Sequence, residues 1–374
     1  GPQLQRTKKI LGEGLLTSEG DFHHRERRLI QPAFHQERIV SYAHIMATYI
    51  ERMNNEWRDG QTIDIHEEMI RLAMGIVAQC LFEADVWSES TEVGKALSET
   101  LEYFDKLASP FGGIRDSLPL PGNKKYRTAL DKLNNLVYKM IREKRHTGED
   151  HGDLLSMLLR AEDEEGTGKM TDQQVRDEAM TLLLAGMETT ANALTWGWYL
   201  LSSNPESEQK LQVEVDRILV DRGFSTAEDY SKLTYTANVF REALRMYPPA
   251  WGLGRAAVND LIIGGYHIPK GSIVVSSQYV IHHDPRFFKD PGKFNPDRWT
   301  PEMREKLPKF AYFPFGGGPR GCVGEPFAWM EGVLVLSSIA RRWKLTHVPG
   351  HKVELLPKIT LRPKYGMMMT LARR

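Results

Sequence analysis

The feature that most constrains this chain is a ten-residue loop, 315–324, in which one cysteine stands among five glycines. Glycine adopts backbone angles that other residues avoid, and it leaves room for a bulky group beside the main chain. The apolar stretch after the loop, 325–343, has the spacing of a helix, with Pro326 in its first turn. Cys322 is therefore expected just before a helix N-terminus, where the dipole and free N–H groups favour a thiolate. An anionic sulfur in such a cradle suits a metal ion.

A second interpretation of the same residues is a glycine-rich turn that contains an incidental buried thiol. The other cysteine of the chain, Cys80, belongs to an apolar helical run at 76–82 and is expected to be an inert core residue. The choice between a ligand and an incidental thiol at Cys322 therefore depends on the rest of the chain.

The bulk composition restricts the classes of protein to which the chain can belong. With 374 residues, 41% of them apolar, it can bury a large core. Lys plus Arg and Asp plus Glu number 49 each, so no net charge attracts the chain to nucleic acid. Two cysteines indicate a reducing compartment, and no apolar run of about 18 residues predicts a membrane span. We expect a single domain over 1–374, cytoplasmic, without a nucleic-acid partner or a signal peptide.

Hydrophobic periodicity predicts a mainly helical chain with a few short strands. Helices are expected at 21–32, 37–58, 64–83, 92–108, 123–145, 171–204, 206–219, 235–247 and 325–343. Strands are expected at 261–263, 266–269, 272–276, 355–361 and 367–371, and loops at 109–122 and 161–169.

The longest helix, 171–204, has an unusual middle. Thr171 and Gln174 have the form of a capping box, and the length of the segment predicts a helix of roughly 50 Å. The run 185–191 places a glycine, an acid and two threonines where good helix formers are expected, at a cost of about 1 kcal/mol for the glycine. Tight packing and hydroxyls bonded back to the helix would also account for these residues, and a functional groove is the alternative.

Two further pairs of residues have the spacing of one helical turn. His23 and Arg27 stand at i and i+4 on a short basic helix, where they could clamp a carboxylate or belong to a solvated face. Glu242 and Arg245 stand at i and i+3, a spacing that is common in helices. Neither pair alone specifies a function.

Taken together, these segments resemble the cytochrome P450 family. Residues 315–324 fill every fixed place of its haem-ligand signature, Phe-x-x-Gly-x-Arg-x-Cys-x-Gly. Four more segments resemble family motifs in the family's order, and the resemblance covers about 20–374. They are His23/Arg27, 185–190, Glu242/Arg245 and Arg298. The family usually has several dozen more residues before the helix at His23 than this sequence shows, and truncation, disorder and a real deletion are the alternatives.

The resemblance implies a mainly α fold with small β-sheets, the cytochrome P450 fold without its usual N-terminal segment. It also implies haem b, iron protoporphyrin IX, with Cys322 as the iron ligand in a loop that includes Gly316 and Gly324. His23, Arg27, Arg255 and Arg320 would neutralise the haem propionates, and Phe315 would pack beside the sulfur. Glu188 and Thr189 would relay protons, whereas Glu242, Arg245 and Arg298 would form a buried structural triad.

The function implied is a monooxygenase that activates O2 with electrons from a separate protein and hydroxylates an apolar small molecule. A ferredoxin or flavodoxin is expected to dock at the face that bears Arg25 and Arg28. The apolar residues expected to line the substrate site are Leu183, Ala185, Thr189, Ala250, Trp251, Leu253 and Ile359.

Two alternatives remain open at this point. One is a haem-thiolate peroxygenase or rearrangement enzyme, which the relay pair Glu188 and Thr189 disfavours. The other is a non-catalytic haem sensor or carrier, for which the sequence offers no output segment. Steady consumption of NAD(P)H with a redox chain and a substrate would distinguish the three.

Overall fold

Helices form most of the part of the chain that the structure, a computed structural model, describes. These residues are 5, 7–90, 92–94, 96–97, 99–100, 103, 121–147, 153–161 and 169–374. The helices are α2 (Lys8–Leu11), α3 (Gly20–Ile30), α4 (Gln36–Glu56), α5 (Ile65–Phe82), α8 (Pro121–Thr147), α9 (Leu154–Arg160), α10 (Asp172–Ser202), α11 (Pro205–Ile218), α12 (Thr234–Met246), α13 (Gln278–His282), α14 (Pro301–Lys306) and α15 (Glu325–Arg342). Within the described residues, no helix is both long enough and apolar enough to cross a membrane.

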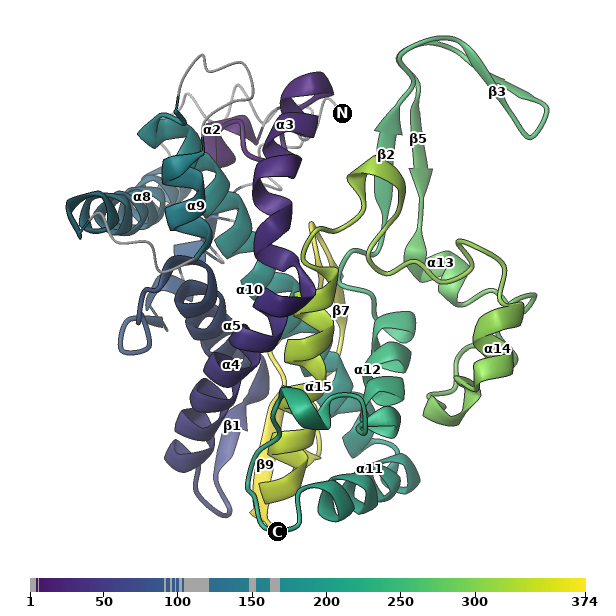
Figure 1. Cartoon of the computed structure of the whole chain (residues 1–374). Coiled ribbons are helices and arrows are strands. Elements are labelled where there is room, and N and C mark those ends of the chain that lie inside the picture. Colours follow the sequence, from purple (N-terminus) through teal and green to yellow (C-terminus); the bar gives the residue numbers. More distant parts are fainter. Residues whose placement is uncertain are drawn as a thin grey trace.

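The strands are short and form four small antiparallel sheets. They are β1 (Thr62–Asp64), β2 (Leu253–Ala256), β3 (Leu261–Ile263), β4 (Tyr266–Ile268), β5 (Ile273–Ser276), β6 (Trp343–His347), β7 (Leu355–Pro357), β8 (Leu361–Pro363) and β9 (Met368–Arg373). One sheet has the order β1-β9-β6, and the others are the pairs β2-β5, β3-β4 and β7-β8. Figure 1 shows β2, β5 and β3 projecting as an arm from the helical body.

The mainly helical architecture expected from the sequence is confirmed, and the departures have local causes. The segment 355–361 is not one strand: the chain turns at 358–360, where the Lys358 amide donates to the carbonyls of Leu356 and Thr360. Strand β6 follows α15 without a loop, so the helical pattern before it concealed its start. Most of the predicted helix at 92–108 and most of the two predicted loops lie outside the described residues.

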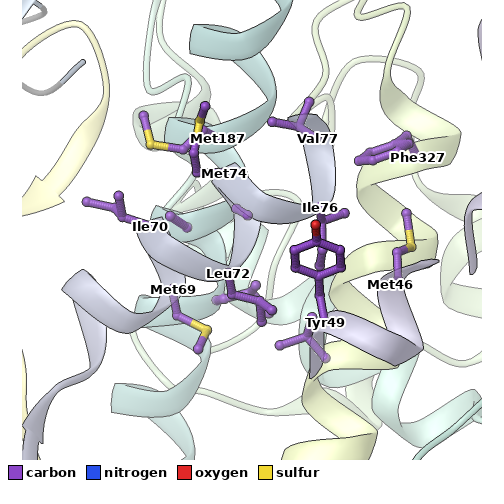
Figure 2. Close-up of a cluster of buried hydrophobic side chains, with 14 of the residues drawn as sticks. Met46, Tyr49, Met69, Ile70, Leu72, Met74, Ile76, Val77, Met187 and Phe327 are labelled. Atoms are coloured by element: carbon purple, nitrogen blue, oxygen red, sulfur yellow. The ribbon is translucent and has the colours of Figure 1, made fainter. Parts of the chain in front are cut away.

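The core that positions the long helix is formed by α4, α5, α10 and α15. Helix α5 packs along α10, and α15 packs along α4. Figure 2 shows side chains from these helices in one apolar cluster, including Met46, Val77, Met187 and Phe327. A Cβ at Gly186 would lie 2.8 Å from Val77 Cγ2, so the glycine in the middle of α10 allows α5 to approach. Packing thus accounts for one of the unusual residues of this helix.

A buried triad fixes α12 to the segment before the cysteine loop. The Arg245 guanidinium donates to both carboxylate oxygens of Glu242, at 2.9 and 2.8 Å, and both side chains are fully buried. Arg298 Nε and Trp299 Nε1 each donate to the same carboxylate at 2.9 Å. The Asn295 amide donates to it at 3.1 Å. The geometry therefore supports the structural triad expected from the sequence.

Candidate functional site

The cysteine loop, residues 315–324, is a tight backbone structure that its glycines make possible. Gly316 and Gly318 have φ angles of 71° and 67°, in the left-handed region that favours glycine. A Cβ at Gly317 would lie 2.5 Å from the ring of Phe310. The Cys322 amide donates to the Phe315 carbonyl at 2.9 Å and closes the loop. Helix α15 then begins at Glu325, so the sequence-based placement of Cys322 before a helix N-terminus is correct.

The Cys322 thiol lies close to the N-terminus of α15. It keeps an exposed surface, although protein atoms surround it closely enough for burial to dominate its titration. Burial raises the pKa of the Cys322 thiol to about 11, against the opposing effect of the Gly324 and Glu325 amides that donate toward the sulfur. The amides at the helix N-terminus thus favour the thiolate, as expected from the sequence, and burial opposes them. A bound cation would supply the missing stabilisation, because metal coordination deprotonates a thiol.

Helix α3 brings cationic side chains to the cysteine loop. Arg27 Nη1 donates to the Gly321 carbonyl at 2.7 Å, which connects α3 directly to the residue before Cys322. From the loop, Arg320 Nη2 donates back to the Ser18 carbonyl at 2.6 Å and to Glu19 Oε2 at 2.7 Å. These contacts join two segments that are about 300 residues apart in the sequence.

His23 is buried in the same region, and its surroundings are positively charged. Burial lowers the pKa of His23, and the neighbouring Arg320, His24 and Arg27 lower it further. Arg255, in contrast, lies on β2 with an exposed side chain that donates to the Gly254 carbonyl at 3.0 Å. Within the described residues, no hydrogen bond joins Arg255 to the cysteine loop. The structure thus brings together three of the four side chains expected to bind propionates, Arg27 and Arg320 as cations and His23 with its charged form disfavoured.

The middle of α10 has one open side. Ala185 is exposed and Thr189 is half-buried, although residues 175–184 and 190–198 of this helix are buried. Thr189 Oγ1 donates to the Ala185 carbonyl at 2.6 Å, one turn earlier in the helix. Bonds of this kind often bend helices. The open side of α10 can therefore accept a ligand, whereas Gly186 packs toward α5.

Glu188, the acid in the middle of α10, is buried and hydrogen-bonded inside the protein. Its side chain is 1% exposed, and its Oε1 accepts hydrogen bonds from Thr360 Oγ1 at 2.7 Å and from Asn192 Nδ2 at 3.0 Å. Arg362 Nε lies 3.6 Å from the same oxygen. Thr360 and Arg362 could not be predicted as partners, because no local pattern relates a C-terminal hairpin to a helix about 170 residues earlier. Asn192, one turn after Glu188 on the same helix, has the i, i+4 spacing that could have identified it.

Cys80 has the environment of a core residue. It is 2% exposed on α5, and its sulfur lies 4.0 Å from the Tyr42 carbonyl. Burial raises the pKa of the Cys80 thiol well above its ordinary value, and nearby Glu331 raises it further. The expectation that Cys80 is an inert core residue fits this environment.

The residues on both sides of the site fit a haem. The glycine cradle and the helix N-terminus present one sulfur, and His23, Arg27 and Arg320 surround the loop with groups that complement carboxylates. Leu253 would contact a Cβ at Gly316 at 3.3 Å, so an apolar side chain lies beside the loop. Cys322 would thus supply the thiolate ligand, and the cations would hold the propionates.

Comparison with known proteins agrees with this arrangement. The family model described as Cytochrome P450 matches residues 2–370. Cyclooctatin synthase from Streptomyces melanosporofaciens is 42% identical over 96% of this chain and 79% of its own length. Pentalenene oxygenase from Streptomyces avermitilis is 35% identical over 94% of this chain and 78% of its own length. A cytochrome P450 crystal structure, 27% identical, has a TM-score of 0.90 and covers 100% of this chain and 87% of that chain.

Proposed function

Because the chain belongs to the cytochrome P450 family of haem-thiolate monooxygenases, we propose that it hydroxylates a mostly hydrocarbon small molecule with electrons from a separate protein. The overall reaction inserts one atom of O2 into a C–H bond and reduces the other to water, with two electrons and two protons. The observation that carries the proposal is the Cys322 sulfur, presented by a glycine loop that Arg27 joins to α3. When bound, a thiolate-ligated haem supplies the cleavage of the O–O bond.

The side chains of the site divide into holding and proton-moving groups. Arg27 and Arg320 would neutralise the two propionates, and His23 would donate a hydrogen bond to one of them. Arg255 would join them if its exposed side chain turned toward the site. The Thr189 hydroxyl, on the open side of α10, would hold a water molecule and pass a proton to oxygen. Glu188 would supply that proton, although its present partners point it toward β8 rather than to solvent.

The substrate is proposed to be a cyclic, terpene-type compound. Among the relatives, one is a cyclooctat-9-en-7-ol 5-monooxygenase, 38% identical over 94% of this chain, and another is a pentalenene oxygenase. Apolar residues expected to line the site, including Trp251, Leu253 and Ile359, offer contacts of the kind that a hydrocarbon skeleton needs. Fatty acids and steroids are the competing classes.

The electron donor is proposed to dock beside the cysteine loop. A hollow of about 550 Å³ lies between α3 and this loop. Its lining consists of Asp21, His24, Arg27, Arg28, Gln31 and Pro319. Arg28 is exposed there, whereas Arg25 is paired with Glu26 at 3.7 Å and is a weaker candidate than the sequence suggested. An acidic ferredoxin or flavodoxin of the cytoplasm would complement this surface.

Turnover with defined electron donors and substrates tests the proposal. With NAD(P)H, a ferredoxin and its reductase, we expect hydroxylated products from cyclic terpene hydrocarbons and much less product from fatty acids or steroids. Reduction should slow as ionic strength rises, and Arg28→Glu should slow it at low salt. Arg58→Glu, at an exposed position two residues after the C-terminal end of α4, serves as the control. Product formation only with hydrogen peroxide would instead indicate a peroxygenase.

A further inference from the structure

The Glu188 carboxylate joins the oxygen side of α10 to a hairpin that is far away in the sequence. Thr360, in the turn between β7 and β8, donates its hydroxyl to Glu188 Oε1 at 2.7 Å. Arg362, on β8, places Nε 3.6 Å from the same oxygen. Thr360 and Arg362 are 6% and 7% exposed, so these contacts form inside the protein. Buried contacts to a carboxylate are strong because water does not compete for them.

Helix α10 and α5 contribute the other side of this cluster. Asn192 Nδ2 donates to Glu188 Oε1 at 3.0 Å and to the Glu188 carbonyl at 2.8 Å. Asn192 Oδ1 in turn lies 3.2 Å from His66 Nε2, in the first turn of α5. The second oxygen of Glu188 is buried and has no hydrogen-bond partner among the described residues. All the contacts therefore converge on one oxygen, and the carboxylate has a single well-defined orientation.

The turn that Thr360 occupies is also connected to the segment expected to contact substrate. Trp251 Nε1 donates to the Lys358 carbonyl at 2.7 Å, and the Leu361 amide donates to the Pro249 carbonyl at 2.9 Å. Leu253, two residues after Trp251, lies beside the cysteine loop at Gly316. The turn 358–360 thus bridges the segment 249–253 and the middle of α10.

We propose that Glu188 anchors the turn 358–360 to α10, with Thr360 as the positioning residue that fixes the acid. The position of the turn and the position of the carboxylate then depend on each other. A change in the turn, which carries Ile359, displaces the carboxylate of Glu188, the residue before Thr189. Removal of that carboxylate likewise releases the turn from α10. The structural tie stands on the contacts alone. Its consequence for catalysis rests on the proposed monooxygenase function.

Hydrogen exchange of the full chain, measured with and without added haem, tests the tie directly. Thr360→Val keeps the size of the side chain and removes the donor, so amides of 355–363 should exchange about tenfold faster or more, the order expected for a lost hydrogen bond to a carboxylate. Thr360→Ser keeps the donor and should stay within about twofold of the unsubstituted protein. The matched control is Thr195→Val. Thr195 is buried on α10, the helix that carries Glu188, and its hydroxyl donates to the Ala191 carbonyl of that helix.

The outcomes distinguish the tie from a general loss of stability. Faster exchange confined to 355–363 in Thr360→Val, with rescue by Thr360→Ser, supports the proposal. Unchanged exchange in this segment overturns it, as does an equal rise throughout the chain. The experiment does not require turnover, so the tie can be established even if the chain proves not to be a monooxygenase.

A second measurement tests the consequence for catalysis. With a hydroxylated substrate in hand, Thr360→Val should lower the ratio of product to NAD(P)H consumed by about threefold or more and leave the KM for the electron donor unchanged. Thr360→Ser should restore the ratio. A normal ratio in Thr360→Val, together with fast local exchange, would show that the turn is tied to Glu188 but that the tie does not position the acid for catalysis.

Discussion

Glu242 and Glu188 are both buried acids that contact residues far away in the sequence, but their carboxylates accept different numbers of hydrogen bonds. Five donors from Asn295, Arg245, Arg298 and Trp299 cover both oxygens of Glu242. In Glu188 the partners converge on Oε1, and Oε2 is buried without a hydrogen-bond partner among the residues that the structure describes. A carboxylate with hydrogen bonds to both of its oxygens is suited to stabilising the fold. An acid with one buried oxygen outside this network is not explained by fold stabilisation alone, which suits a functional role.

Substitution of Glu242 should have the largest effect on stability, because it removes the carboxylate on which all five of these hydrogen bonds converge. Glu242→Gln leaves Arg245 and Arg298 buried beside an amide that also carries donors, at a cost of about 3–5 kcal/mol. We expect a much lower urea midpoint and a low yield of haem-loaded protein. Glu206→Gln, at an exposed position on α11, is the control. A midpoint close to that of the unsubstituted protein would remove the triad from the account of the fold.

Glu188→Gln should affect turnover more than stability. The amide oxygen can still accept from Thr360, but the side chain no longer donates or releases a proton at neutral pH. Proton delivery by a positioned group accelerates a reaction by roughly 10²–10⁴-fold. We therefore expect turnover to fall by about 10²-fold, with the rates of product formation and of NAD(P)H consumption falling together. Stopped-flow reduction and steady-state turnover measure this. If Glu188→Gln destabilises the protein as much as Glu242→Gln does, the two acids do not differ in role.

Thr189→Ala should change the fate of the electrons rather than their flow. The substitution removes the hydroxyl on the open side of α10 and keeps the apolar contacts of the helix. We expect normal haem content and substrate binding, continued consumption of NAD(P)H, and a several-fold rise in hydrogen peroxide per product. The ratio of product to NAD(P)H gives the result. Unchanged coupling would leave Thr189 as a residue that only bends α10.

A third buried acid, Glu178, extends the comparison and should show the smallest effect. Burial, opposed by the Leu15 amide and reinforced by nearby Glu26, raises the pKa of Glu178 from 4.5 to about 8. The native state therefore binds more protons than the unfolded state between these values, and stability falls as pH rises through this window. The free energy of unfolding should therefore fall less between pH 5 and 8 in Glu178→Gln than in the unsubstituted chain. The difference should be about 1.4 kcal/mol or more, the value of one pKa unit.

Urea unfolding at several pH values measures this effect. Glu305→Gln, at an exposed position on α14, should unfold with the pH dependence of the unsubstituted chain. If stability depended on pH in the same way in Glu178→Gln and in the unsubstituted chain, the neighbours of Glu178, and not a bound proton, would offset its negative charge.

The sequence predicted the parts of the molecule that have local signals. The capping box at Thr171, the break before α5 and the helix after Cys322 all depend on neighbouring residues, and the structure contains them. The ties to Glu188 could not be predicted from spacing, because Thr360 and Arg362 sit in a hairpin with no pattern that specifies a partner. The orientation of buried polar groups depends on tertiary contacts, and for this reason the direction of the Glu188 side chain could not be predicted from the sequence.

The visible spectrum of the reduced, CO-bound protein tests the central claim most directly, because it reports whether a thiolate ligates the haem. We expect the thiolate signature in the unsubstituted chain and in Cys80→Ser, since Cys80 is a core residue of α5. Cys322→Ser should lose the signature while its circular dichroism stays that of a folded helical protein. Retention of the signature in Cys322→Ser, or its loss only in Cys80→Ser, would contradict the assignment of the cysteine loop as the haem site.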